Sequence, residues 1–293
     1  MHRLNLEIPF TAPYALRHHF DEGATITQRG FWLEGTPVVV RLSQEADDAP
    51  VTATVYSDRP LEPLLARLRD AAAAMICAQD DLADFHTAVK RDARLKRVAV
   101  ALYGLKPLRI PDLWTSLMRA LLGQQISIGA ARAIRKKLAE RFGRVIEVPE
   151  GTAAVLPDPH TTLALSPDDL LSLGFSRRKV EYAHTIAQAF VDGAIDPQAL
   201  RDASADEMIR TLCALRGVGV WTAECAGIFC LGHPDLLPAD DLGVQKAVAQ
   251  LYRLPEDPDA KVVRKYGEKW KGWRSYAAVY LWAARRHGVL ESL

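Results

Sequence analysis

The sequence predicts two regions of different class: an α+β N-terminal domain over residues 1–90, with helices on an antiparallel sheet, and an all-α region over residues 91–293. Residues 1–60 alternate between apolar and polar side chains, which is typical of strands. From about residue 80 the apolar residues recur at helical spacing, between short runs of Pro, Gly and Asp. The chain has 293 residues, 49% of them hydrophobic, and can therefore bury two cores.

The expected strands occupy residues 4–10 (LNLEIPF), 24–35 (ATITQRGFWLEG), 36–44 (TPVVVRLSQ) and 51–57 (VTATVYS). The second and third meet across a Glu-Gly-Thr-Pro turn, and the fourth is rich in β-branched residues, which favour strands. A helix over residues 61–78 closes this domain. The pattern is typical of an antiparallel sheet covered by helices.

The helical region begins with residues 113–143, where a Gly-Gln-Gln sequence interrupts an amphipathic pattern. Helices are then expected within 166–174, 176–193 and 204–215, each with a Ser at its start; Ser204 and Glu207 have the spacing of a capping box. Further helices are expected within 221–232, 240–252 and 276–288. No internal repeat interrupts this order.

Composition excludes several classes of function. No run of 18 uncharged apolar residues predicts a membrane span, and the N-terminal MHRLNLEIPF does not have the pattern of a secretory signal, so we expect a cytoplasmic protein. The four cysteines form no Cys-x-x-Cys pair, which argues against a zinc or iron–sulfur site. Residues 1–92 carry 9 Lys/Arg and 14 Asp/Glu, whereas residues 93–293 carry 28 and 22. The basic C-terminal region indicates either an anionic partner or a solvated basic face.

The sequence LRGVGVWTAE, residues 215–224, joins two expected helices through two glycines. A dinucleotide fingerprint would require a preceding strand and a third glycine, and a Walker loop would require Gly-Lys-Ser/Thr. A glycine hairpin between helices leaves the N–H groups of Gly217, Gly219 and Val220 available to an anion. The alternative is a tight turn whose glycines only relieve steric strain.

Asp240 and Asp241 follow about twenty residues later, at the start of the next expected helix. One carboxylate would cap that helix and the other would lie favourably in its first turn. A carboxylate beside a cleft can also stabilise a developing cation or activate water. Both interpretations remain open from the residues alone.

The order LLGQQIS, LRGVGVWTA, LPADDLGVQKA and KWKGWRSYAAVYLW resembles the helix-hairpin-helix DNA glycosylases, specifically the DNA-3-methyladenine glycosylase II, alkylation-repair type. The resemblance spans nearly the whole chain and is strongest over residues 113–131 and 212–284. It implies a TBP-like N-terminal domain and a helix-hairpin-helix region of two helical subdomains with the active-site cleft between them.

The resemblance also implies an activity. The enzyme would flip an alkylated purine such as 3-methyladenine or 7-methylguanine out of double-stranded DNA and hydrolyse its N-glycosidic bond. Asp241 would be the catalytic carboxylate, and Asp240 a cap or support. Trp221 stands where lyase members carry a lysine, which implies a monofunctional enzyme. Trp221 and Trp282 match aromatic walls of the base pocket. Cys225 and Leu242 stand where the DNA-3-methyladenine glycosylase II type has tyrosines.

DNA contacts are implied at three places. The side chain that fills the gap left by the flipped base would come from Gln124, Gln125 or Ile126, with Gln125 at the wedge position. Phosphates would meet the hairpin amides and two basic runs, Arg132, Arg135, Lys136 and Lys137 or Arg177, Arg178 and Lys179. The backbone carbonyls of Cys213, Leu215 and Val218 would hold a monovalent cation, Na⁺ or K⁺, at the hairpin.

The resemblance implies no cofactor for catalysis and no iron–sulfur cluster, because no cysteine follows Cys230. We expect a monomer that does not bind membranes. Two other functions remain open: a non-catalytic helix-hairpin-helix module that binds DNA, and a glycosylase for oxidised, mismatched or otherwise damaged bases.

Overall fold

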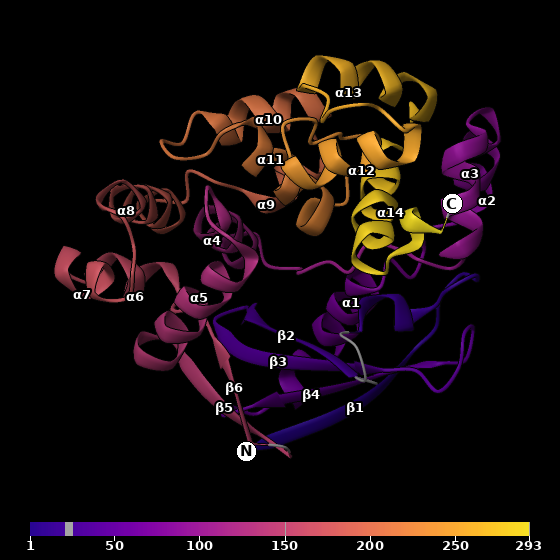
Figure 1. Ribbon diagram of the computed structural model, residues 1–293. Helices are drawn as coiled ribbons and strands as arrows, with labels where there is room; N and C mark the ends of the chain where they lie inside the picture. The colour runs from indigo at the N-terminus through magenta and orange to yellow at the C-terminus, as the bar shows by residue number, and fades with distance from the viewer. Residues whose placement is uncertain (21–25, 150, 293) are drawn as a thin grey trace.

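The computed structural model describes residues 1–20, 26–149 and 151–292 (Figure 1). A four-stranded antiparallel sheet of order β1-β4-β3-β2 forms the N-terminal domain. Its strands are β1 His2–Ile8, β2 Ile26–Leu33, β3 Thr36–Ser43 and β4 Val51–Ser57. β2 and β3 are joined by Glu34 and Gly35, which both have positive φ, as a two-residue hairpin requires. The sheet predicted from the sequence is confirmed; Ala24 and Thr25, expected in the second strand, lie outside the described residues.

Two layers cover this sheet on opposite faces. Val38, Val40 and Leu42 of β3 face a core that they share with helix α1, Leu65–Met75. Val39 points to the other face, where it packs with residues from a second, smaller sheet. β3 is therefore buried on both sides, which explains its nearly continuous run of valines.

The second sheet is a two-stranded hairpin of β5 Arg144–Val148 and β6 Gly151–Val155. The sequence analysis predicted helices throughout residues 91–293 and missed this hairpin. Each strand has only five residues, so the alternation is too short to stand out from the helices on either side. Ile146 and Val155 bury it against Val39 and Tyr56 of the main sheet.

The remaining chain is helical, as predicted. Its α-helices are α2 Ala83–Ala88, α3 Ala93–Ala101, α4 Leu113–Gly123, α5 Ile128–Phe142, α6 Pro159–Ala164, α7 Pro167–Ser172, α8 Arg177–Val191, α9 Pro197–Asp202, α10 Ala205–Cys213, α11 Val220–Ala226, α12 Leu242–Tyr252, α13 Ala260–Gly267 and α14 Arg274–Arg286. One group packs around α4 and α8, and a second group combines α12, α13 and α14 with α3. Figure 1 shows the two groups above the sheet, with α11 and α12 where they meet.

Side-chain caps fix where several of these helices begin. Asp112 accepts hydrogen bonds from the backbone N–H groups of Trp114 and Thr115 at the start of α4. The capping box predicted for Ser204 and Glu207 is only half formed: Ser204 Oγ accepts from Glu207 N at 3.3 Å, and no return bond from the Glu207 side chain is present in the described structure. A complete box forms instead at α7, between Ser166 and Asp169.

The chain crosses between the two cores more than once. Leu82, Phe85 and Val89 belong to the large helical core, whereas Leu108 and Ile110, later in the sequence, pack into the core of the sheet. The N-terminal domain and the helices are therefore joined by interleaved packing as well as by the chain. Within the described ranges, no helix is long and apolar enough to cross a bilayer.

Candidate active site

The glycine hairpin joins α10 to α11, and its two glycines have different surroundings. Gly217 has φ +95°, and a Cβ there would lie 2.3 Å from Cγ of Tyr182. Gly219 has ordinary φ, and a Cβ there would meet no atom within 4 Å. Gly219 also precedes α11 without a side-chain cap, and Val220 beside it is exposed. The hairpin therefore presents uncapped backbone N–H groups to solvent at Gly219 and Val220.

The loop between α4 and α5 is tied to this hairpin. Gln124 Nε2 donates to the carbonyl of Gly217 at 3.0 Å and to Thr222 Oγ1 at 2.9 Å. Lys179 Nζ donates to the carbonyls of Leu122 and Gln124 at 3.0 and 2.9 Å. The side chain of Gln124 thus faces the hairpin, whereas a wedge would project from the loop. Lys179, which was expected to contact a DNA phosphate, donates its hydrogen bonds to carbonyls of the protein.

The tip of the same loop projects outward. Gln125 is exposed and has φ +56°, a left-handed conformation that a residue with a side chain adopts only with strain. Ile126 is exposed beside it, and Ile128, the first residue of α5, is 82% exposed. Two exposed apolar side chains on a projecting loop that also holds a strained residue are typical of a contact surface.

Asp241 is held between two tryptophans. Its Oδ1 accepts from the indole N–H of Trp282 at 2.8 Å and from the backbone N–H of Val244 at 2.9 Å, and its Oδ2 accepts from the indole N–H of Trp221 at 3.0 Å. Asp241 is thereby the N-cap of α12. The carboxylate is fixed by donors from α11, α12 and α14, three elements distant in sequence.

Asp240 lies outside this arrangement. Asp240 was expected to cap the helix or to support the loop, but α12 begins at Leu242, so the residue in the cap position is Asp241. Asp240 is exposed and forms an ion pair with Arg264 at 3.2 Å. Gly243 allows the Trp282 ring to lie close to Asp241, because a Cβ at this position would be 2.8 Å from Asp241 Oδ1 and 3.1 Å from the Trp282 ring.

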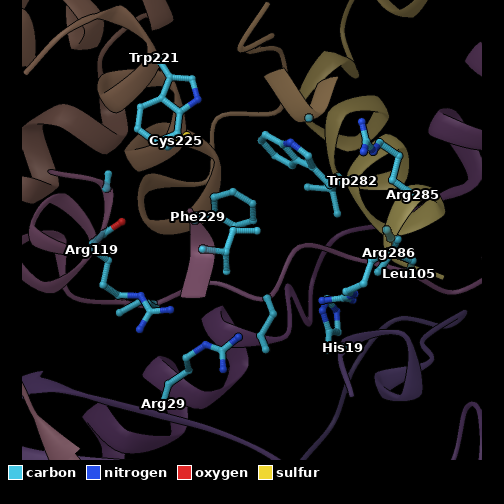
Figure 2. A pocket seen from close by; sticks show the side chains of 18 of the residues that line it. His19, Arg29, Leu105, Arg119, Trp221, Cys225, Phe229, Trp282, Arg285 and Arg286 are labelled. Atoms are coloured by element: carbon cyan, nitrogen blue, oxygen red, sulfur yellow. The ribbon is translucent and has the colours of Figure 1, made fainter. Parts of the chain in front are cut away.

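A cavity of about 720 Å³ opens beside the tryptophans. Its walls come from α4, α5, α11 and α14 and from the N-terminal domain, and Figure 2 shows Trp221, Cys225, Phe229 and Trp282 around its upper part. Phe229 packs against Trp282 with ring centroids 5.5 Å apart. Leu242 was expected in this wall, but its side chain is 70% exposed and the backbone of Gly243 lines the cavity beside it.

Phe229 reaches the cavity through an irregular stretch of helix. After α11 the chain forms one π-helical turn, Gly227–Leu231, in which Phe229 lies. A side chain at Gly227 would collide with Leu236 at 2.3 Å, which shows how tightly this turn is packed. Such single π turns occur frequently at functional sites, where they redirect a side chain.

The other end of the cavity is cationic. Arg29, Arg119, Arg135, Arg285 and Arg286 line it together with His19, and the described lining residues include no Asp or Glu. Burial lowers the pKa of His19 to about 3, so the imidazole is neutral at ordinary pH. The sequence analysis missed these residues. The available signal was Arg119, an arginine within the almost entirely apolar helix LWTSLMRALLG.

The other basic residues singled out from the sequence are dispersed. Arg177 and Arg178 are exposed at the start of α8, and Lys137 is exposed on α5. Lys136 lies 3.8 Å from Glu140 in an ion pair along α5. Only Arg135 of these residues also lines the cavity.

The backbone atoms expected to hold a cation lie at the end of α10 and in the hairpin. The carbonyl of Leu215 already accepts from the N–H of Val218 at 3.0 Å, which leaves it a second lone pair. Among the described residues, no group of three His, Cys, Asp or Glu side chains is placed to hold a metal ion. A cation at the hairpin would therefore depend on carbonyl oxygens alone.

Glu224, on α11, is a buried acid behind the hairpin. Its side chain is 6% exposed, and its Oε2 has no hydrogen-bond partner in the described structure. Burial raises its pKa from 4.5 to about 8, with Arg264 lowering it and Asp240 raising it. The folded protein therefore keeps this carboxyl protonated at pH values where the unfolded chain has released the proton.

We expect this carboxyl to make the fold less stable as pH rises. Between pH 4.5 and 8 the folded state holds one more proton than the unfolded state, so stability falls by up to about 1.4 kcal/mol per pH unit. The Gln of Glu224→Gln has no proton to lose. The unfolding free energy of this variant should therefore match the wild type near pH 4.5 and exceed it by about a few kcal/mol at pH 9. Urea unfolding at both pH values measures this, and an equal effect at both would contradict it.

The described elements define a class of protein: a helix-hairpin-helix fold with a carboxylate beside a cavity between two helical groups. The sequence model of the HhH-GPD superfamily of base excision DNA repair proteins matches residues 118–272. This chain belongs to that superfamily, which confirms the resemblance noted from its motifs.

Individual relatives agree with this assignment. A DNA-3-methyladenine glycosylase of Bacillus subtilis is 32% identical over 203 residues, covering 69% of this chain and 67% of the relative. The 3-methyladenine DNA glycosylase of Archaeoglobus fulgidus superposes with a TM-score of 0.78 at 23% identity, over 97% of this chain and 98% of that one. An 8-oxoguanine glycosylase/lyase of Clostridium acetobutylicum, in complex with double-stranded DNA, superposes with a TM-score of 0.71 at 19% identity, over 94% of this chain and 93% of that one. Both structures show that this fold spans nearly the whole chain.

Proposed function

We propose that this protein is a monofunctional DNA glycosylase that hydrolyses the N-glycosidic bond of alkylated purines such as 3-methyladenine and 7-methylguanine. The observation that carries the proposal is Asp241, fixed between the indoles of Trp221 and Trp282 at the edge of a cavity large enough for a base. The name of the B. subtilis relative supports the choice of alkylated bases. Double-stranded DNA is then the partner, and the protein acts in the compartment that holds DNA.

The proposed chemistry needs no general acid. An alkylated purine already carries a positive charge, so it leaves when the bond between C1′ and the ring nitrogen breaks and the bond's electron pair neutralises the ring. The sugar becomes oxocarbenium-like, and the anionic carboxylate of Asp241 stabilises that charge. Water then bonds to C1′ and releases a proton, which leaves an abasic site. The two indole N–H donors orient the carboxylate without acting on the substrate.

Release of a free base is the decisive test. Methylated duplex DNA incubated with the protein should yield free 3-methyladenine or 7-methylguanine, detected by mass spectrometry. A non-catalytic helix-hairpin-helix module would bind the same duplex and release no base, so that outcome would overturn the proposal.

Trp221 argues for hydrolysis without strand cleavage. It precedes Thr222 at the start of α11, and its indole N–H is engaged with Asp241. No lysine stands at this position to form a Schiff base with the sugar, so we expect no covalent adduct after borohydride reduction. An 8-oxoguanine glycosylase/lyase would give such an adduct, and trapping therefore separates the two enzymes that share this fold.

Gln125 is the proposed wedge at the DNA surface. Its exposed position at the tip of the loop, with φ +56°, supports this proposal, because a projecting side chain is free to enter a base step. Gln125→Ala is expected to weaken binding to a duplex with an abasic-site analogue by about tenfold, because parting a base step costs a few kcal/mol that the wedge offsets. Ile126→Ala is the matched comparison. If Gln125→Ala binds like the wild type, the wedge is elsewhere.

The hairpin is the proposed phosphate clamp. The uncapped N–H groups at Gly219 and Val220 would bind one phosphate of the damaged strand, assisted by Na⁺ or K⁺ on the carbonyls of Cys213, Leu215 and Val218. Duplex affinity measured in K⁺ or Na⁺ and in a bulky organic cation of equal ionic strength would test the ion. We propose that the protein acts as a monomer.

A further inference from the structure

The cavity beside Asp241 extends past the tryptophans to an arginine cluster, which we define as Arg119 on α4 and Arg135 on α5, whose charges lie close enough to interact. Figure 2 shows Arg119 on the opposite side of the cavity from Trp282, with Phe229 between them. Release of a methylated base does not require this end of the cavity, because the methyl group is small and the methylated ring is already cationic.

The arginine cluster has no acidic partner among the described residues that line the cavity. Arg119 and Arg135 are half-buried, and no described residue accepts a hydrogen bond from either side chain or forms an ion pair with it. Burial, together with the neighbouring charges of Arg29, Arg135 and Arg132, lowers the pKa of Arg119 to about 9. The described lining of the cavity opposes these guanidinium groups with no carboxylate, so an anion inside the cavity would meet positive charge that the protein does not neutralise.

We propose that the arginine cluster binds a carboxylate carried on the alkyl group of the damaged purine, as in a carboxymethylated purine, which deepens and rests on the proposed glycosylase activity. Such a lesion is a zwitterion when alkylated on a ring nitrogen. Its cationic ring would lie at the tryptophans beside Asp241, and its carboxylate would reach the arginines, so both ends meet the opposite charge. The 720 Å³ volume exceeds what a methylated base alone requires.

The chemical step stays that of the proposed function. The bond between C1′ and the ring nitrogen breaks, its electrons neutralise the ring, and water adds to C1′ with loss of a proton. The carboxylate remains attached to the released base and is not altered. The arginine cluster therefore selects the substrate, whereas Asp241 acts on the sugar.

A DNA backbone phosphate is the other anion that these arginines could bind by the same chemistry. The cluster shares its cavity with Phe229 and Val279 and lies within walls from three parts of the fold, whereas the projecting tip of the wedge loop and the open Gly219 are on exposed surface. An anion that arrives attached to a flipped base reaches such a cavity directly. The experiment below tells the two sources apart.

The first measurement is binding of free bases, which needs no catalysis. Trp221 and Trp282 line the cavity, so their fluorescence reports occupancy. Free 7-(carboxymethyl)guanine should bind the wild type at least about tenfold more tightly than 7-methylguanine, as expected for charge-assisted hydrogen bonds. Arg119→Leu and Arg135→Leu should each remove most of this advantage, and Arg97→Leu, on the exposed face of α3, should retain it. Equal binding of the two bases by the wild type would overturn the proposal.

The second measurement is base release from two DNA samples, one methylated and one carboxymethylated. In Arg119→Leu, release of carboxymethylated purines should fall about tenfold or more, while release of methylated purines should hold or rise, because a like charge has been removed from near the cationic ring. Loss of both activities together would indicate only a structural role for Arg119. Weaker, less salt-sensitive binding of Arg119→Leu to undamaged duplex would assign the arginine to a backbone phosphate. Wild-type release of methylated but not carboxymethylated bases would refute this inference alone, and release of neither would refute the proposed function.

Discussion

Replacing Asp241 with Asn should slow the release of 7-methylguanine from methylated DNA by about 10²–10³-fold, the usual cost of removing one preorganised electrostatic stabiliser. Asn is an equally good N-cap, so its Oδ1 can still accept from the N–H of Val244 and the indole of Trp282. Its amide nitrogen would face the indole N–H of Trp221, a second donor, so that one bond is lost. The fold should therefore be retained with a loss of about 1 kcal/mol.

Asp240→Asn is the matched control for this prediction. Asp240 is adjacent in sequence and carries the same charge, but it is exposed and, within the described part of the chain, its ion-pair partner is Arg264. Exposed ion pairs contribute little, so we expect its single-turnover rate to stay within about twofold of the wild type. If Asp240→Asn is the slower enzyme, or if Asp241→Asn keeps the wild-type rate under single-turnover conditions, the carboxylate has been assigned to the wrong residue.

The sequence predicted the large elements of the fold because each has a long enough pattern. The alternation through TPVVVRLSQ and the helical spacing of residues 113–143 extend over many residues, and short caps such as Ser166 mark where helices start. The β5–β6 hairpin was missed because its two strands are five residues each and its partner is a sheet a hundred residues earlier. Long-range burial of this kind leaves little trace in a local pattern.

The site residues likewise divide into those that a local motif predicted and those that depend on long-range packing. The motif order led to Asp241, Trp221 and Trp282, which the structure brings together through two indole hydrogen bonds. The spacing could not tell which way each side chain points. Gln124 turns inward to the hairpin and Leu242 turns out to solvent, and both were expected at the site. The cationic end of the cavity combines residues from distant helices and from the N-terminal sheet, and no local motif connects them.

Gly217 and Gly219 give the second large effect, because the same substitution should act on different properties at the two positions. Gly217→Ala adds a Cβ 2.3 Å from the Tyr182 ring at a residue with φ +95°. Overpacking and a left-handed alanine together should cost about 2–5 kcal/mol of unfolding free energy. Gly219→Ala adds a Cβ that touches no protein atom, so its cost should be limited to the poorer N-cap, no more than about 1 kcal/mol.

For DNA binding we expect the opposite order, with the larger effect at Gly219. Gly219 precedes the uncapped start of α11, where a phosphate must come close to the backbone to reach its N–H groups. A methyl group at that point should weaken duplex binding by about tenfold, or ~1.4 kcal/mol. Urea unfolding and equilibrium binding to the same duplex measure the two quantities for both variants. If Gly219→Ala binds DNA like the wild type, the glycine is not where the strand approaches, and the hairpin is a tight turn between two helices and no clamp.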